Sequence, residues 1–258
     1  ILLNGEDITE LKQKQLKPYR KNMQMIFQDP YASLNARMTV RDIIAEPLIA
    51  HGVVRKKEDA NELIYPMLER VGLTKEHSGR YAHEFSGGQR QRVGIARALI
   101  LQPDLVICDE PISALDVSIQ AQVVNLLKDF QEEKGVSYLF IAHDLAVVKH
   151  ISNRILVMYL GRVVEIADCD ELYSNTLHPY TKTLLSAVPV ADPAVEESRE
   201  RVPIRGEVPS LTKRPEGCPF HDRCSHVCDR CRREVPVLKD VGKGHEVACF
   251  LYEQQFNK

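Results

Sequence analysis

The chain has 258 residues, of which 44% are hydrophobic and 27% charged, a composition typical of a globular protein with one main core. Its net charge of −2 gives no general reason to bind nucleic acid or an anionic membrane surface, so no nucleic-acid partner is predicted. The longest apolar runs are far shorter than the roughly 20 residues that cross a bilayer, and no secretory leader is recognisable, so we expect a cytosolic protein.

The first elements are a short strand and a buried strand. Residues Ile1 to Gly5 have the pattern of a strand that runs into a turn, and because the chain opens on Ile rather than Met we expect it to start inside a domain. A buried strand is predicted over Met23–Phe27, ending at Gln28-Asp29-Pro30, where the proline should stop regular structure. The loop that follows is a candidate ligand-facing segment.

Two helices should come next and form a helical insert, and a third helix should follow them. Thr39 can cap a helix from Val40 to about Ala50, and apolar residues at helical spacing predict a second helix over Glu58–Val71. A third helix should begin at Ser86 and run to about Leu101, before Gln102-Pro103 ends it.

From there the chain alternates between short apolar strands and helices. Strands without polar alternation are typical of a parallel sheet that is covered on both faces, so the pattern predicts an α/β fold. The expected elements are strand Leu105–Cys108, helix Val117–Lys134, strand Tyr138–Ala142, helix Leu145–Ile151 and strand Ile155–Tyr159.

The start of the third predicted helix is a candidate anion site. In the segment Phe85–Arg92, a capping serine and two glycines precede Gln89, which occupies the capping-box position. A helix N-terminus offers unpaired N–H groups, and glycines let a phosphate approach the backbone. Taken alone, the segment is more simply explained as a capped helix with a flexible loop before it.

Two carboxylates end the strand that follows. Ligands of a doubly wound sheet bind at the carboxyl ends of its strands, which would place Asp109 and Glu110 at the mouth of a site. Asp109 suits Mg²⁺ held through water, and Glu110 suits a general base or water-orienting group. Taken alone, a strand that ends in Asp-Glu is more often a polar turn.

Five short elements in chain order resemble the nucleotide-binding domain of ABC transporters, with Phe85 in place of the leucine that usually precedes the signature serine. They look like its Q-loop, signature, Walker B pair, D-loop and H-loop, and they stand at Gln28, at Ser86, Gly87, Gly88 and Gln89, at Asp109 and Glu110, at Ser113 to Asp116, and at His143. The resemblance implies ATP and Mg²⁺ as ligands. It implies catalytic roles for Gln28, Glu110 and His143, ligand-binding roles for Asp109 and the signature, and a place at the dimer interface for Asp116.

The resemblance also implies a phosphate-binding loop, Gly-x-x-x-x-Gly-Lys-Ser/Thr, and residues 1–258 do not contain it. In ABC domains this loop precedes the segment where this chain begins, so we expect the α/β fold to be incomplete at the N-terminus. Because such domains hold ATP between the phosphate loop of one subunit and the signature of the other, this chain is expected to bind and hydrolyse ATP poorly by itself.

Several stretches narrow the resemblance to the ATPases of oligopeptide and dipeptide importers, in particular their F-type subunit; nickel and other small-solute importers share much of the pattern. The stretches are Gln28–Asn35, Glu110–Gln122, His178–Thr181 and Leu184–Pro189. This implies a D-type ATPase partner, two transmembrane permease subunits, an extracytoplasmic binding protein and a peripheral place on the cytoplasmic face of the membrane. ABC-type ATPases of DNA repair are disfavoured, because no long coiled coil separates Gln28 from Ser86.

Five of the seven cysteines crowd into the last 41 residues, at Cys218, Cys224, Cys228, Cys231 and Cys249. Such spacing in a cytosolic chain favours a metal centre over disulfides, and it suits either Zn²⁺, with help from His221, His226 or His245, or a [4Fe–4S] cluster. Reduced cysteines that only pack are the alternative. The other two, Cys108 and Cys169, have the pattern of buried apolar residues.

The tail resembles those of peptide-importer ATPases. This resemblance implies an iron–sulfur site that uses Cys218, Cys224, Cys231 and Cys249, which would leave Cys228 spare. The chain is expected to divide into an ATPase core (1–37 with 102–188), a helical signature subdomain (38–101), a linker (189–216) and a Cys-rich tail (217–258). A metal-binding regulatory module without catalytic activity is the other interpretation.

Overall fold

The computed structural model describes residues 1–188, 206 and 215–256. It divides into two compact units, Ile1–His143 and Asp144–Lys258, each with its own sheet. The predicted linker, residues 189–216, lies almost entirely outside the described residues. No helix among the described residues is long and apolar enough to cross a membrane.

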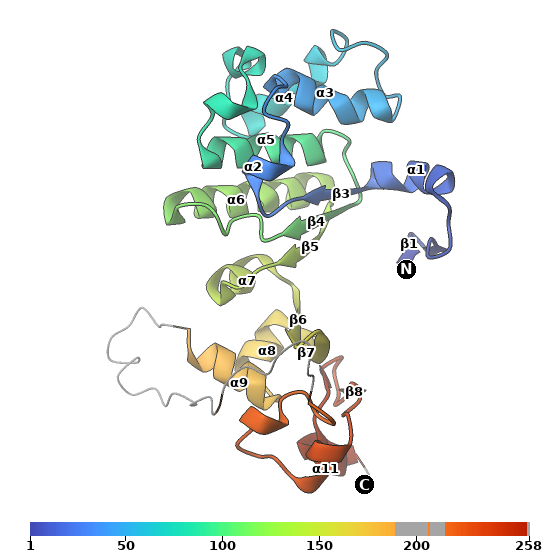
Figure 1. Ribbon diagram of the computed structural model, residues 1–258, viewed down its shortest axis with the longest axis vertical. Coiled ribbons are helices and arrows are strands. Elements are labelled where there is room, and N and C mark those ends of the chain that lie inside the picture. The colour runs from blue at the N-terminus through green and yellow to red at the C-terminus, as the bar shows by residue number, and fades with distance from the viewer. Residues whose placement is uncertain (189–205, 207–214, 257–258) are drawn as a thin grey trace. The chain divides into compact units, whose positions relative to one another are not determined.

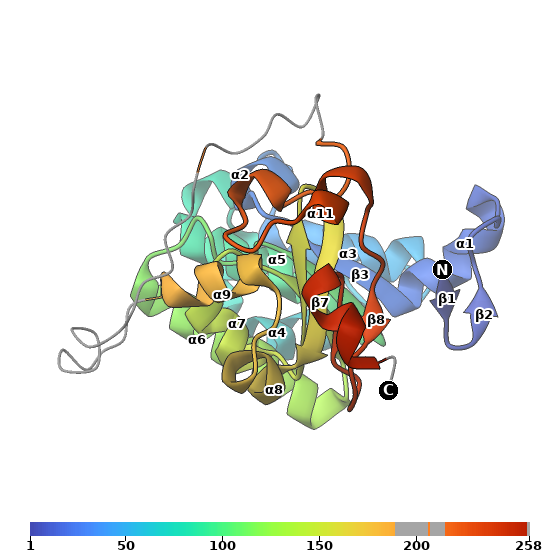
Figure 2. The ribbon, with the colours of Figure 1, turned by 90° about the horizontal axis from the view of Figure 1, so that it is seen from below.

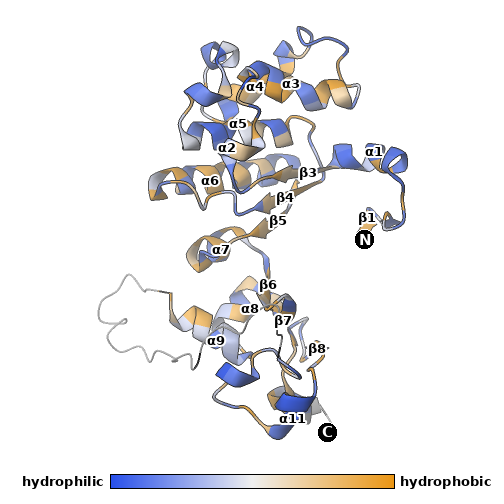
Figure 3. Cartoon of the chain, in the orientation of Figure 1, coloured by the Kyte–Doolittle hydropathy of each residue, from blue (hydrophilic) through white to orange (hydrophobic). Residues whose placement is uncertain are grey.

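The first unit is built around a three-stranded parallel sheet in the order β3-β4-β5. Figure 1 shows α5 and α6 beside this sheet, and Figure 3 shows its strands as mostly apolar. The sheet consists of β3 Met23–Ile26, β4 Leu105–Asp109 and β5 Ser137–Ile141, and the first unit also has a separate antiparallel pair, β1 Leu2–Leu3 and β2 Glu6–Asp7. The helices of the first unit are α1 Gln13–Asn22, α2 Pro30–Ser33, α3 Val40–Ala50, α4 Asn61–Arg70, η1 Lys75–Gly79, η2 Ala82–Glu84, α5 Gly87–Leu99 and α6 Val117–Lys134.

Helix starts in this unit follow local capping chemistry. The Thr39 hydroxyl accepts a hydrogen bond from the Asp42 amide at 3.2 Å, so α3 begins where the sequence predicts. Helix ends follow local chemistry as well: α6 stops at Gly135, whose φ of +68° is the left-handed conformation of a helix C-cap. Helices α3, α4 and α5 then bury an apolar core that includes Ile44 and Leu68.

Two predictions for this unit were wrong. Pro30 does not stop regular structure; it is the first residue of α2, where its fixed φ suits a helix, and the Asp29 side chain accepts from the Tyr31 and Ala32 amides. The sheet is not covered on both faces along β5, because Leu139 and Ile141 are 55% and 45% exposed. β5 is an edge strand of this sheet, and alternate residues along it are exposed.

The second unit has a four-stranded antiparallel sheet in the order β6-β7-β9-β8. Figure 2 shows the long ribbon of β6 and β7 within it. Its strands are β6 Arg154–Tyr159, β7 Arg162–Asp168, β8 Lys239–Asp240 and β9 Glu246–Val247. Its helices are α7 Leu145–Ile151, α8 Cys169–Ser174, α9 Pro179–Ser186, η3 His221–Arg223, α11 Asp229–Arg233 and η4 Phe250–Phe256.

The alternating pattern led us to place Ile155–Tyr159 in a parallel βα series, and that placement was wrong. β6 pairs antiparallel with β7 through a two-residue turn, in which Tyr159 faces Arg162. Leu160 and Gly161 both have positive φ, +47° and +74°, as a type I′ hairpin requires. The glycine two residues after the apolar strand was the signal in the sequence.

Candidate functional site

The carboxyl ends of three parallel strands bring three predicted site residues together. Ile26 of β3 is level with Cys108 of β4, and Asp109 is level with Ile141 of β5. Gln28, Glu110 and His143 follow these positions by one or two residues. The Gln28 Nε2 donates to Glu110 Oε2 at 2.8 Å, and the His143 Nδ1 lies 3.4 Å from the same oxygen. We call these three residues with Asp109 the strand-end site.

Glu110 is held in an uncommon backbone conformation. Its φ is +42°, in the left-handed region that a non-glycine residue enters at a cost of about 1–3 kcal/mol. Its amide donates to the Ile141 carbonyl at 3.0 Å, and its own carbonyl accepts from the Ser113 amide at 3.2 Å and the Ser113 hydroxyl at 3.1 Å. Three hydrogen bonds therefore hold the backbone of Glu110 in this conformation.

The other two acidic residues predicted for the site, Asp109 and Asp116, lie on different elements from each other. Asp109 is the last residue of β4 and is half-buried. Asp116 is exposed and precedes α6 as its N-cap, but its side chain makes no capping hydrogen bond. Its carboxylate is thus accessible to a partner molecule.

The predicted signature forms a closed capping box. Ser86 is the N-cap of α5, where its hydroxyl accepts from the Gln89 amide at 3.3 Å and its amide donates to Gln89 Oε1 at 3.1 Å. A side chain at Gly88 would come within 3.0 Å of the Ile119 Cγ2, and one at Gly87 within 3.2 Å of the Tyr31 hydroxyl. The two glycines therefore permit close packing on α6 and α2, in addition to any approach of a ligand.

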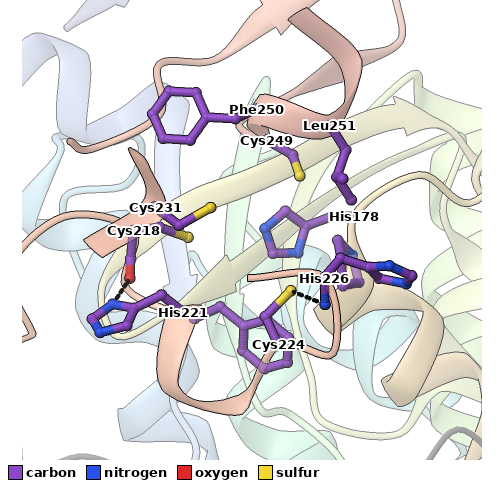
Figure 4. A pocket seen from close by; sticks show the side chains of 11 residues that line it. His178, Cys218, His221, Cys224, His226, Cys231, Cys249, Phe250 and Leu251 are labelled. Atoms are coloured by element: carbon purple, nitrogen blue, oxygen red, sulfur yellow. Dashed lines mark hydrogen bonds between the residues drawn. The ribbon is translucent and has the colours of Figure 1, made fainter. Parts of the chain in front are cut away.

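The second unit contains a pocket that four tail cysteines share, which we call the cysteine pocket (Figure 4). Those four are the cysteines that the resemblance implied, whereas Cys228 is exposed and does not line it. The cavity is about 20 Å³, close to the space that one water molecule needs. Its lining residues are His178, Pro179, Cys218, Phe220, His221, Cys224, His226, Cys231, Cys249, Phe250 and Leu251.

The pocket favours neutral thiols. Burial raises the pKa of Cys218 to about 11 and that of Cys249 to about 12, and it also raises the pKa of Cys224 and Cys231. Cys228 differs, because hydrogen bonds from the Cys231 amide and thiol lower its pKa. A cation in the pocket would have to displace protons from the buried thiols.

His178 is a pocket residue to which we had given no role. It is 2% exposed, and its Nδ1 accepts from the Tyr180 amide at 3.1 Å, so it also caps α9. Burial lowers its pKa to about 4, which keeps the ring neutral. With Nδ1 an acceptor, the proton of the neutral ring is on Nε2. Burial depends on tertiary packing, so the His178-Pro179-Tyr180-Thr181 motif was the only signal in the sequence.

A buried carboxylate with a buried histidine beside it holds the segment before His178. The Glu165 carboxylate is completely buried and accepts from the Leu177 amide at 2.7 Å and the His178 amide at 3.1 Å. The Nε2 of buried His245 lies 2.9 Å from the same carboxylate, and its Nδ1 lies 3.4 Å from Glu171. His245, one of the three histidines considered for zinc, is therefore engaged with carboxylates and does not line the pocket.

The remaining two histidines border the pocket differently. The His221 Nδ1 lies 2.8 Å from the Cys218 carbonyl and its Nε2 lies 2.9 Å from Asp222, so both ring nitrogens have partners. His226 is exposed. Within the described part of the chain, no three or more His, Cys, Asp or Glu side chains are grouped so that they could hold one metal ion.

Comparison with known protein families finds a match in each of the two units. Residues 1–113 match the family described as ABC transporter, and residues 164–231 match the C-terminal region of the oligopeptide/dipeptide transporter family. The oligopeptide transport ATP-binding protein AppF of Bacillus subtilis is 54% identical over 98% of this chain and 77% of its own length. The chain belongs to the ABC transporter ATP-binding proteins, in their oligopeptide and dipeptide group.

Other relatives and solved structures support this membership. The oligopeptide transport ATP-binding protein OppF of Salmonella typhimurium is 54% identical over 95% of this chain and 73% of its own length. Among solved structures, cbiO1 from Clostridium perfringens, part of the ABC transporter complex cbiONQ, has a TM-score of 0.59 at 25% identity, with 67% of each chain covered. The dimeric ATP-binding cassette MJ0796 bound to ADP and Pi has a TM-score of 0.58 at 26% identity, covering 65% of this chain and 72% of its own. The ABC nucleotide-binding fold is therefore confirmed.

Proposed function

We propose that the chain is the ATP-hydrolysing subunit of an ABC importer for oligopeptides or dipeptides. The observation that carries this proposal is the strand-end site, where Gln28 and His143 both approach one carboxylate oxygen of Glu110. The relatives whose names describe oligopeptide transport support peptides over nickel or another small solute as the cargo. We also propose a peripheral place at the cytoplasmic face of the membrane, beside two permease subunits.

Each residue of the strand-end site would have one task in hydrolysis. Glu110 would accept the proton of the attacking water, and Gln28 would orient that water through the amide that now contacts Glu110. His143 would donate to the γ-phosphate. The half-buried carboxylate of Asp109 suits Mg²⁺ through water, and that ion would neutralise charge on the β- and γ-phosphates when bound.

The signature and Asp116 would act on a second ATPase subunit. The α5 N-terminus presents Ser86 and the amides of Gly87 and Gly88, which suit a partner's γ-phosphate, and exposed Asp116 suits the interface. We propose the D-type ATPase of the same importer as this partner, with a binding protein acting through the permeases. In this scheme 38–101 is the signature subdomain, 1–37 with 102–188 the core, 189–216 the linker and 217–258 the tail.

The chain by itself should bind ATP weakly in its own site. Residues 1–258 lack the amides and the lysine of a phosphate loop, which hold the β- and γ-phosphates in this family. The signature half could still complete the site of a partner that carries the loop. Titration of the chain with a fluorescent ATP analogue should therefore show much weaker binding than the same chain fused to the N-terminal segment of AppF.

The cysteine pocket would hold a [4Fe–4S] cluster through Cys218, Cys224, Cys231 and Cys249. Four cysteine side chains around one cavity support this donor set. A single zinc ion needs all its ligands about 2.3 Å from one point, whereas a cluster spreads four thiolates over four irons. Among the described residues no such group of ligands is found, so the side chains as they stand hold neither a zinc ion nor a cluster. Since the cavity is small, these side chains would have to turn outward to admit it.

The central test is hydrolysis by the AppF-segment fusion, assembled with a D-type partner and permeases. Glu110→Gln should lower turnover at least about 100-fold while ATP binding persists, because the variant keeps the shape of Glu110 but loses its basic oxygen. Turnover like that of the unsubstituted complex would refute the role of Glu110. Glu133→Gln, on the surface of α6, is the matched control and should leave turnover unchanged. Iron and labile-sulfide analysis after anaerobic purification tests the cluster.

A further inference from the structure

One thiol of the cysteine pocket has a close neighbour outside it. The Cys228 Sγ lies 3.4 Å from the Cys231 Sγ. Cys231 lines the pocket, while Cys228 is exposed and does not. Two residues separate them, and the Cys231 amide donates to the Cys228 carbonyl at 3.0 Å, which closes a tight turn. This is the Cys-x-x-Cys spacing of reversible disulfides.

The backbone of Cys231 is fixed from two sides. Its carbonyl accepts from the Cys218 amide at 2.8 Å, and a Cβ on Gly217 would lie only 2.4 Å from that oxygen. Between the two cysteines, Arg230 lies 4.0 Å from the centre of the Phe250 ring and pairs with Glu253. The Cys231 sulfur can therefore change neighbours by rotating its side chain, without movement of the chain.

We propose that Cys228 and Cys231 are a redox-active pair, which a small-molecule disulfide oxidises reversibly, and that their disulfide withdraws Cys231 from the cysteine pocket. The first part stands on the sulfur geometry and exposure alone. The second part rests on the proposed function, in which Cys231 is one of four ligands. One sulfur cannot serve both partners, so oxidation and metal loading exclude each other.

The chemistry is two thiol–disulfide exchanges. The Cys228 thiolate attacks one sulfur of the small disulfide, which forms a mixed disulfide and releases one small thiolate. The Cys231 thiolate then attacks the Cys228 sulfur and releases the second. The protein loses two protons and two electrons as its S–S bond forms, and the small disulfide is reduced to two thiols. Exposure makes Cys228 the thiol that the reagent reaches first, whereas Cys218 is buried.

The first experiment measures the disulfide without any metal. The 258-residue chain is equilibrated in glutathione buffers of graded ratio, its free thiols are blocked, and tryptic peptides are mass-analysed. Trypsin cuts after Arg230, so the disulfide should link peptide 224–230 to Cys231-Arg232 with the loss of two hydrogens, and dithiothreitol should reverse it. Because that peptide also carries Cys224, Cys228→Ser should abolish the link and Cys224→Ser should retain it. A link that survives Cys228→Ser, or glutathione attached to Cys228 with no link, would overturn the pair.

The second experiment measures the competition with Zn²⁺, which is redox-inert and so is not itself attacked by the oxidant. Equilibrium dialysis should show that oxidation weakens Zn²⁺ binding at least about tenfold, since a lost ligand matters more than a lost outer partner. The Cys228→Ser chain in the same buffer should keep its affinity. Equal affinity of the oxidised and reduced chains would overturn the competition and leave the disulfide measured above. Failure of the reduced chain to bind Zn²⁺ would count against the four-thiolate site as well, again without touching the first result.

Discussion

The strand-end site and the cysteine pocket use polar groups in opposite environments. Around Glu110 the partners are largely open to solvent, with the His143 side chain 72% exposed, and each is supplied by the end of a strand. In the cysteine pocket, His178 is 2% exposed, and a completely buried carboxylate supports its segment. Exposed polar groups contribute little to stability and stay available to substrate, whereas buried ones are costly to disturb. Substitutions should therefore affect stability in one region and turnover in the other.

The largest stability effect is expected where buried His245 faces the buried Glu165 carboxylate. His245→Ala removes the imidazole that faces Glu165 and leaves that buried carboxylate with only the Leu177 and His178 amides as partners. The free energy of unfolding should fall by about 3–5 kcal/mol, as for other broken buried pairs. Urea unfolding followed by circular dichroism measures it, with His226→Ala, an exposed histidine of the same tail, as the control within about 0.5 kcal/mol. Equal losses of unfolding free energy for the two substitutions would contradict the contrast between buried and exposed polar groups.

The second prediction concerns pH. The pKa of His178 is about 4 in the folded chain against about 6.5 when unfolded, so the unfolded chain takes up the proton first. The stability contributed by the neutral ring is fully present above about pH 6.5 and is lost as the pH falls toward about 4, up to about 3 kcal/mol. His178→Asn keeps a capping oxygen for α9 and should flatten the dependence of unfolding free energy on pH in this window. An unchanged slope would assign the acid sensitivity to other groups.

A third prediction separates contact from backbone strain. Gly217 and Gly244 have the same φ of +73°, but a Cβ at Gly217 would lie 2.4 Å from the Cys231 oxygen, while one at Gly244 would meet no atom within 4 Å. Gly217→Ala should therefore destabilise the chain by about 1–3 kcal/mol more than Gly244→Ala. Similar unfolding midpoints for the two variants would mean that the backbone of the tail shifts to accommodate the added methyl group.

The smallest stability effect is expected in the strand-end site. Gln28→Ala removes an exposed hydrogen bond to Glu110, so the free energy of unfolding should change by less than about 1 kcal/mol. In the assembled AppF-segment fusion, the same variant should nevertheless lose most of its ATP turnover. A large loss of stability would show that the site is a structural network, and the contrast between the two regions would disappear.

Local chemistry explains which parts of the fold the sequence could predict. The starts of α3 and α5 depend on Thr39 and Ser86, whose capping partners lie three residues away, so both helices were placed correctly. The partner of β6 depends on a turn beyond the strand, and its short apolar run was compatible with either a parallel or an antiparallel sheet. The exposed face of β5 depends on tertiary packing, which periodicity does not report.

The candidate sites divide in the same way. The approach of Gln28 and His143 to Glu110 follows from the rule that parallel strands present their carboxyl ends at one edge, so the order of motifs was sufficient. Membership of the cysteine pocket came from family resemblance, since spacing alone could not choose four cysteines among five. His178 enters that pocket through burial, and no local pattern predicts which histidine the fold will bury.

The packing of Gly88 against Ile119 has a mechanical consequence. A Cβ on Gly88 would lie 3.0 Å from the Ile119 Cγ2, tighter than ordinary van der Waals contact, so the first turn of α5 and the first turn of α6 are closely packed at this point. The two segments that would face the partner subunit's nucleotide therefore touch through one glycine and one β-branched side chain. A push on either helix start is passed to the other as a displacement, because a close-packed contact does not compress.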